Sequence, residues 1–297
     1  MPARTAYANR MSDLAPALDA LLRLPGIAAG VESAREACTA LRWHEALRRR
    51  IPEAAAESRI RGAQASAQLD GAQLPLGVIR DLVRGAQPWP AHLDPVDGVV
   101  RGAVQATAET EFLRSLVVQT PAQALARLHI AAVGGAAGGA VGLGGGDSVG
   151  RPRVADEVCR EFVDLGPAPE GEALTARIAG ILDLVSAAGS APVALVGALV
   201  HAEVCVVRPF VRGNGLVARA LERAIVHGAG LDPTGVSVPE AGYLAAGDTA
   251  YLGALTAYAT GRADGVALWL RQACDAYVEG ARQGRSIADS VLAGRIV

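Results

Sequence analysis

Apolar residues recur at intervals of three and four along almost the whole chain, which is the spacing of helices that bury one face. Alanine and leucine, two strong helix formers, fill most of these stretches. Proline, glycine and capping residues divide them, so the sequence predicts helices over 12–24, 31–50, 52–69, 77–84, 95–118, 121–133, 170–188, 192–207, 214–227, 246–260 and 264–282. We therefore expect an all-α fold.

Two segments depart from the helical pattern. Residues 134–150 contain nine glycines, and part of this run, Gly142 to Asp147, is similar to a dinucleotide-binding loop. No strand precedes it and no helix follows it as a βαβ unit requires, so the freedom of the glycine backbone favours a flexible loop over a phosphate cradle. Residues 151–165 carry Val154, Val158, Phe162 and Val163 among polar residues, which is the only strand character in the chain, and they predict a short β-hairpin.

The charge balance excludes several classes of protein. The formal net charge is −2, whereas a general nucleic-acid binder needs a strong positive excess to displace counterions. All 28 basic residues are arginine, so a P-loop lysine, a Schiff-base lysine and a lysine general base are excluded. Hydrophobic residues make up 51% of the chain and charged residues 20%, which provides a large core and excludes global disorder.

Cysteine spacing and hydropathy predict where in the cell the protein is located. The four cysteines form no CxxC pair, so we expect reduced, mostly buried thiols and neither a disulfide framework nor a metal site. The longest apolar stretch, 192–207, is interrupted by His201 and Glu203 and is too short to span a bilayer. No apolar signal core lies near the first residue, so the sequence predicts a cytoplasmic protein with no membrane partner.

One helix–turn–helix segment carries the functional argument. A helix ending near Val207 is followed by Arg-Pro-Phe-Val-Arg-Gly-Asn-Gly and then by an amphipathic helix. The backbone amides of Gly213-Asn214-Gly215 would point forward at a helix N-terminus, where unpaired N–H groups and the helix dipole favour an anion. Arg219 lies about one turn further along and can face the same anion. The spacing fits a diphosphate-binding turn with an arginine clamp, and it fits equally an ordinary glycine turn between packed helices.

The twelve residues from Arg208 to Arg219 resemble the signature of the Fic family, HxFx(D/E)GNGRxxR. The family pattern is matched at Phe210, Gly213, Asn214, Gly215 and Arg219. The order of helices over 103–229, with a segment ahead of the motif at the place of the family's flap, is also similar to the family core. The resemblance implies a Fic-fold helical core over 91–235 with a short β-hairpin flap, an N-terminal helical region over 1–90 and a C-terminal helical extension over 236–297.

Three positions depart from the family pattern. Arg208 stands in place of the histidine that serves as general base, and a guanidinium stays protonated and cannot accept a proton. Arg212 replaces the acidic residue that helps hold magnesium, and Leu216 replaces the first phosphate-binding arginine. Loss of a general base alone costs about 10²–10⁴-fold in rate. Magnesium binding is therefore doubtful, and neither His201, which is about 10 Å away by helical rise, nor His129 or His227 supplies a replacement base.

A second resemblance lies near the N-terminus. The sequence Ser66-Ala-Gln-Leu-Asp70-Gly71 is similar to the family's inhibitory motif, (S/T)xxxE(G/N), with aspartate in place of glutamate. The resemblance implies that the Asp70 carboxylate pairs with Arg219 and blocks productive nucleotide binding. Aspartate is one methylene shorter than glutamate, and Gly71 is equally typical of a plain helix C-terminus.

These patterns favour a Fic-like protein that keeps a site for a nucleotide or another anionic small molecule but is deficient in magnesium-dependent AMP transfer. Its role would be binding or regulation. The residues expected to bind the anion are Phe210, Arg212, Gly213, Asn214, Gly215 and Arg219, while Arg208 stands at the catalytic position and its own role stays open. The alternative is a repurposed enzyme that acts on a different anionic substrate, and a third reading is a structural protein with a vestigial turn. A protein target would bind at the flap.

Overall fold

The structure is a computed structural model that describes residues 14–133, 148–154 and 156–295, and these residues contain no strand. The helices are Leu14–Leu22, α2 (Ile27–Arg42), α3 (Ile51–Leu69), α4 (Leu76–Arg84), α5 (Pro95–Leu113), α6 (Pro121–Val133), α7 (Gly171–Ala187), α8 (Val193–Val207), α9 (Asn214–Gly228), α10 (Pro239–Ala246), α11 (Asp248–Ala259) and α12 (Ala263–Leu292), with 3-10 turns η1 (Glu45–Arg48) and η4 (Val163–Leu165). The expected all-α architecture is confirmed.

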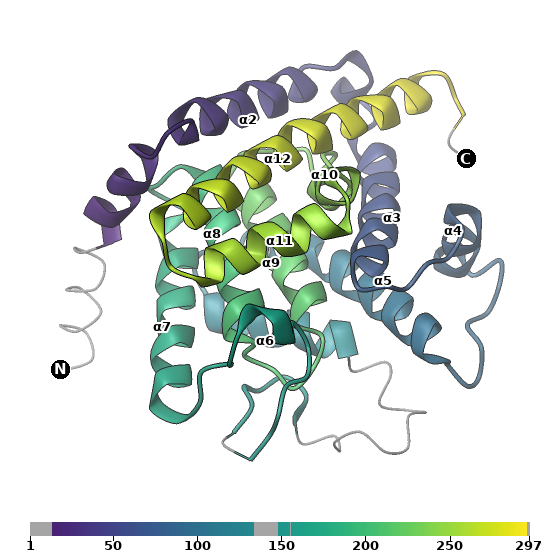
Figure 1. The fold of residues 1–297 in the computed structure, drawn as a ribbon. Coiled ribbons are helices and arrows are strands. Elements are labelled where there is room, and N and C mark those ends of the chain that lie inside the picture. Colours follow the sequence, from purple (N-terminus) through teal and green to yellow (C-terminus); the bar gives the residue numbers. More distant parts are fainter. Residues whose placement is uncertain (1–13, 134–147, 155, 296–297) are drawn as a thin grey trace.

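Helices α8 and α9 pack against each other at the centre of the fold (Figure 1). Helices α5 and α6 pack on α9, and α7 and α12 pack on α8. Twelve of the fifteen residues of α8 are buried, as expected of a helix that is apolar on all faces. The turn between these two helices, which carries the signature residues, is thereby fixed at one end of the most enclosed helix pair.

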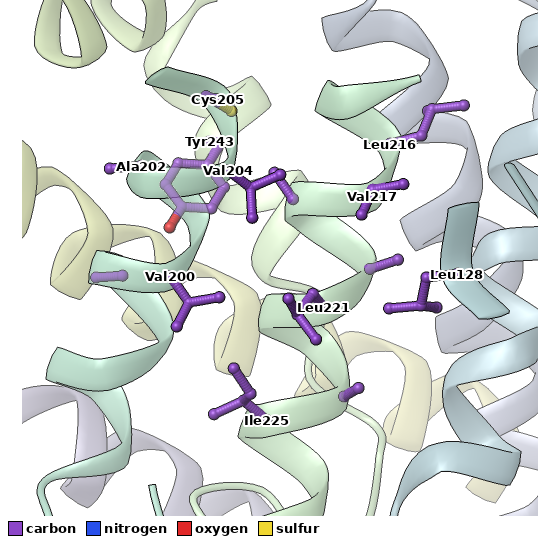
Figure 2. Close-up of a cluster of buried hydrophobic side chains, with 14 of the residues drawn as sticks. Leu128, Val200, Ala202, Val204, Cys205, Leu216, Val217, Leu221, Ile225 and Tyr243 are labelled. Carbon is purple, nitrogen blue, oxygen red and sulfur yellow. The ribbon is translucent and has the colours of Figure 1, made fainter. Parts of the chain in front are cut away.

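Figure 2 shows the apolar contacts that fix this pair of helices. Val200 of α8 and Ile225 of α9 point into the space between them, and both are fully buried. Leu216 lies with Leu128 of α6 on another side of α9, and it is 4% exposed. The position that holds a phosphate-binding arginine in the Fic signature is therefore part of the hydrophobic core in this chain.

The predicted β-hairpin over 151–165 is wrong. The described part of this stretch, called the flap segment here, is irregular and ends in η4. Its polar groups bind elsewhere: Arg153 N donates to the Pro209 carbonyl at 2.8 Å, and Val154 N donates to the Glu157 carboxylate at 2.9 Å. The Glu157 carboxylate also pairs with Arg151 at 2.7 Å. Since these groups are satisfied by side chains and by the signature turn, no partner strand is needed.

The three predicted regions share one core. A single cluster of buried residues includes Ile60 from 1–90, Leu221 from 91–235 and Trp269 from 236–297. Their boundaries stay predictions. Most of the glycine-rich run, 134–147, lies outside the described residues. Within the described residues no single helix is long and apolar enough to cross a bilayer, and Leu14–Leu22 with Ile27–Arg42 reach that length only as a pair bent by 91°.

Candidate functional site

The signature turn is held closed by one of its own side chains. Helix α8 ends at Val207 and is followed by Arg208, whose backbone is left-handed (φ 49°, ψ 66°), and α9 begins at Asn214 after Gly213 at φ 79°. The Asn214 side chain spans the turn, because its Oδ1 accepts from Phe210 N at 2.9 Å and its Nδ2 donates to Phe210 O at 2.9 Å. Asn214 thus fixes the direction of the backbone amides that precede α9.

Phe210 packs beneath the turn rather than facing the solvent. Its ring is 1% exposed and stacks on His129 of α6, with centroids 3.7 Å apart and planes 9° apart. Nδ1 of His129 accepts from Gly150 N at 2.9 Å, so Nε2 carries the proton and lies 3.2 Å from Arg212 O. The neutral imidazole therefore joins the turn to α6 and to Gly150, the residue just before the flap segment, and the Phe210 ring packs against it.

The buried His129 makes stability depend on pH. Burial lowers its pKa from 6.5 to about 4, so the unfolded chain binds this proton more readily than the folded chain. The contribution is fully favourable above pH ~6.5, and stability falls as the pH drops from there towards 4, by about 3 kcal/mol in all from this group. Urea unfolding at a series of pH values should show this loss, and His129→Gln should show less of it; equal pH slopes for the two proteins would contradict the assignment.

The backbone amides of the turn donate hydrogen bonds to a carboxylate of the protein itself. Oε1 of Glu161, from the flap segment, accepts from Gly213 N at 2.6 Å, and Oε2 accepts from Asn214 N at 2.9 Å. Oε2 also accepts from Asn214 Nδ2 at 2.8 Å. We call these three donors the anion cradle. It is the arrangement expected of an anion site at a helix N-terminus, and here the anion belongs to the protein itself.

Sequence reasoning missed Glu161. It lies 52 residues before Gly213, and the only signal was an acidic residue in the segment expected to form the flap. Burial raises the pKa of the Glu161 carboxyl, with the nearby Asp70 carboxylate acting in the same direction, while the three donors of the anion cradle oppose that rise. Both carboxylate oxygens accept hydrogen bonds, which is the pattern of the ionised form.

Arg208 turns away from the anion cradle. Its side chain is almost fully buried, and the guanidinium donates to Phe162 O at 3.1 Å, to Gly166 O at 2.7 Å and, at 3.4 Å, to Glu161 O. Its Nε also donates to Val206 O at 3.1 Å. The role of Arg208 that the sequence left open is thus to hold backbone carbonyls near the turn, because the N–H groups of a buried guanidinium need acceptors.

Arg219 pairs with the segment that resembles the inhibitory motif. Its Nη2 donates to Asp70 Oδ1 at 2.7 Å, and Nε and Nη2 donate to Ser66 Oγ at 2.8 Å and Ser66 O at 2.9 Å. The predicted contact between Asp70 and Arg219 is thus direct. A Cβ atom added to Gly215 would lie 2.6 Å from Asp70 Oδ1, so the carboxylate covers the first turn of α9 and needs glycine there. Gly71 follows with φ 80°, as a helix terminus requires.

The far side of Arg219 belongs to a buried polar network. Nη1 of Arg219 donates to the Tyr251 hydroxyl at 3.3 Å, and that oxygen lies 2.7 Å from Nε2 of His201. Nδ1 of His201 lies 2.9 Å from Glu222 Oε2. Two further hydroxyls donate to Glu222 Oε1 at 2.6 Å each, those of Tyr243 and Tyr277. Burial alone would lower the pKa of Arg219, but Asp70 and Tyr251 raise it above its ordinary value, so the guanidinium stays charged.

The geometry can bind an anion and offers little for proton transfer. Both nitrogens of His129 and of His201 already have partners inside the protein. The backbone carbonyl of Arg212 serves as an acceptor for His129. Among the described residues no three His, Cys, Asp or Glu side chains form a group that could hold a metal ion.

No protein-family model and no curated protein sequence matches the chain. Solved structures are similar throughout its length. "Fic-1 (aa134 - 508) from C. elegans" has a TM-score of 0.61 at 18% identity and covers 94% of this chain and 76% of its own. A Fic family protein from Desulfovibrio desulfuricans G20 has a TM-score of 0.62 at 18% identity, with 92% and 76% covered. A Fic-domain-containing signaling protein from Bacteroides thetaiotaomicron VPI-5482 has 0.57 at 15% identity, with 88% and 98% covered.

Proposed function

We propose that this protein, whose fold is the Fic fold, binds a nucleotide or another anionic small molecule at the N-terminus of α9 and is deficient in magnesium-dependent AMP transfer. One observation carries the proposal: Gly213 N, Asn214 N and Asn214 Nδ2 converge on a single carboxylate. Donors that converge on a carboxylate can equally hold a phosphate oxygen, since both groups offer negatively charged acceptors. Binding at this site would serve a regulatory or interaction role.

Three side chains support the loss of conventional transfer. Arg208 donates to backbone carbonyls, so it neither accepts a proton nor faces the anion cradle. Leu216 is buried in the core and cannot bind a phosphate. Arg212 brings a positive charge to the position of an acidic metal-binding residue, where it would repel Mg²⁺. General-base catalysis, metal binding and one phosphate contact are thus all missing from the residues that supply them in the Fic signature.

We expect no AMP transfer above background when the protein is incubated with labelled ATP, Mg²⁺ and a cell lysate. Loss of the base alone predicts a rate lower by about 10²–10⁴-fold. A Fic protein with a complete signature serves as positive control, and Arg219→Ala marks the background of this chain. Strong labelling that disappears in Arg219→Ala would show that the site still transfers AMP.

Two parts of the proposal concern control and partners. Asp70 would keep Arg219 from a ligand, because its carboxylate already holds that guanidinium.

The flap segment exposes Val154, Val158 and Val163 to solvent, by 54%, 68% and 64%, which fits a protein target at this segment. A repurposed enzyme would turn over the anion that it binds, and a purely structural protein would bind none, so binding and turnover assays with nucleotides separate the three readings.

A further inference from the structure

We propose that Glu161 is an internal ligand that closes the anion cradle until an anionic ligand displaces it, and that Arg208 is the positioning residue that keeps it in place. This inference rests on the proposed function, because it concerns the regulation of the same site. Glu161 would then be a second carboxylate, besides Asp70, that keeps a ligand from the site. It belongs to the flap segment, whereas Asp70 lies at the end of α3.

Glu161 and a ligand need the same three hydrogens. Each N–H of the cradle donates to one acceptor, and Gly213 N, Asn214 N and Asn214 Nδ2 are all used by the Glu161 carboxylate, at 2.6–2.9 Å. A phosphate or carboxylate of a ligand therefore binds there only when the Glu161 side chain leaves. Competition is thus a direct consequence of the geometry.

Arg208 connects the position of the lost catalytic histidine to the segment that carries Glu161. Its guanidinium holds the carbonyls of Phe162 and Gly166 on the C-terminal side of Glu161, and its own carbonyl accepts from Nε of Arg153 at 2.9 Å. Phe162 and Arg208 are the two non-glycine residues with positive φ in the described residues, at 50° and 49°. Left-handed backbone at such residues persists only where surrounding contacts impose it, and both lie at this junction.

Some interactions favour the Glu161 carboxylate in the anion cradle and others oppose it, so a ligand can displace it. Three charge-assisted hydrogen bonds favour the Glu161 carboxylate in the cradle. Burial of the charge and the nearby Asp70 carboxylate oppose it, and together they outweigh the donors in their effect on the Glu161 pKa. A ligand that satisfies the same donors and also reaches Arg219 would replace two intramolecular carboxylates with its own anionic groups.

The test measures the binding of inorganic pyrophosphate by calorimetry to the full chain and to Glu161→Gln. Glutamine keeps the size of the side chain but offers one acceptor in place of two charged oxygens, so the variant should bind pyrophosphate about tenfold more tightly or better. The matched control is Asp164→Asn, which removes one negative charge from an exposed residue of the same segment and should leave the affinity unchanged. Circular dichroism checks that each variant is folded.

A second variant tests the positioning role. Arg208→Lys keeps the charge but lacks the planar guanidinium that reaches the separate carbonyls of Phe162 and Gly166 together. It should therefore tighten pyrophosphate binding when Glu161 is present and have no such effect in the Glu161→Gln background. If wild type and Glu161→Gln bind pyrophosphate with equal affinity, and Arg219→Ala abolishes binding, then Glu161 is not an internal ligand of the cradle. The proposed function would be unaffected by that result. Absence of pyrophosphate binding in every variant, Asp70→Ala included, would contradict both the proposed function and the role of Glu161 as an internal ligand.

Discussion

Asp70→Ala should lower the free energy of unfolding by about 2 kcal/mol, and it should tighten the binding of inorganic pyrophosphate. The stability loss follows from the fully buried Arg219 side chain, which keeps Ser66 and Tyr251 as partners but loses the carboxylate with which it pairs. We expect a value below the 3–5 kcal/mol typical of a fully buried pair because the Asp70 side chain is 22% exposed. Binding should improve because Arg219 becomes available to the ligand.

Arg219→Ala separates this effect from general loosening of the fold. It should cost about 3–5 kcal/mol, since it removes a large buried side chain and leaves Ser66 and Tyr251 with unused polar atoms, and it should also abolish pyrophosphate binding. Glu32→Ala is the matched control for the loss of a carboxylate, because its pair with Arg35 is exposed and its removal should change neither quantity. Urea unfolding and calorimetry measure both effects. Unchanged pyrophosphate affinity in Asp70→Ala would reduce the inhibitory resemblance to a structural contact.

Glu222→Ala should destabilise the fold most, by about 4–6 kcal/mol, which approaches the whole stability of many domains. The Glu222 carboxylate is 1% exposed and accepts from two tyrosine hydroxyls and His201, so its removal leaves three buried polar groups without their acceptor. Glu222→Gln keeps the shape and one acceptor, and its amide can donate to Nδ1 of His201 if the ring changes tautomer. We expect a loss of about 1–2 kcal/mol for that variant. Similar urea midpoints for Glu222→Ala and wild type would contradict the network.

The sequence predicted the parts of the site that depend on local spacing. Helix termini at Val207 and Asn214 and the forward-pointing amides of the turn follow from proline, glycine and apolar periodicity. The contact of Asp70 with Arg219 followed from resemblance to the inhibitory motif. These features depend on residues that are close in the chain or on a pattern that is read residue by residue.

The sequence could not predict what the irregular segments do. The flap segment has the valines and the phenylalanine that are typical of a strand, but its polar groups bind the signature turn. No local signal reveals a partner that is about fifty residues away. Arg208 could be excluded as a base from its chemistry alone, whereas its role in holding carbonyls depends on the position of Phe162 and Gly166 in the fold. A predicted helix over 31–50 in fact ends at Arg42, where His44 caps the separate turn η1 through Nδ1.

The position of Cys159 allows the movement of the flap segment to be followed by thiol labelling. Its Sγ lies 3.5 Å from Asn214 Nδ2, in the same segment as Glu161, and it is half-buried. The other three cysteines, Cys38, Cys205 and Cys274, are buried. Burial raises the pKa of the Cys159 thiol, so a thiol-specific dye reacts slowly while the segment lies on the turn and faster once it moves away. The labelling rate of this one thiol therefore records the opening of the cradle in the unmodified chain, without a substitution at the site.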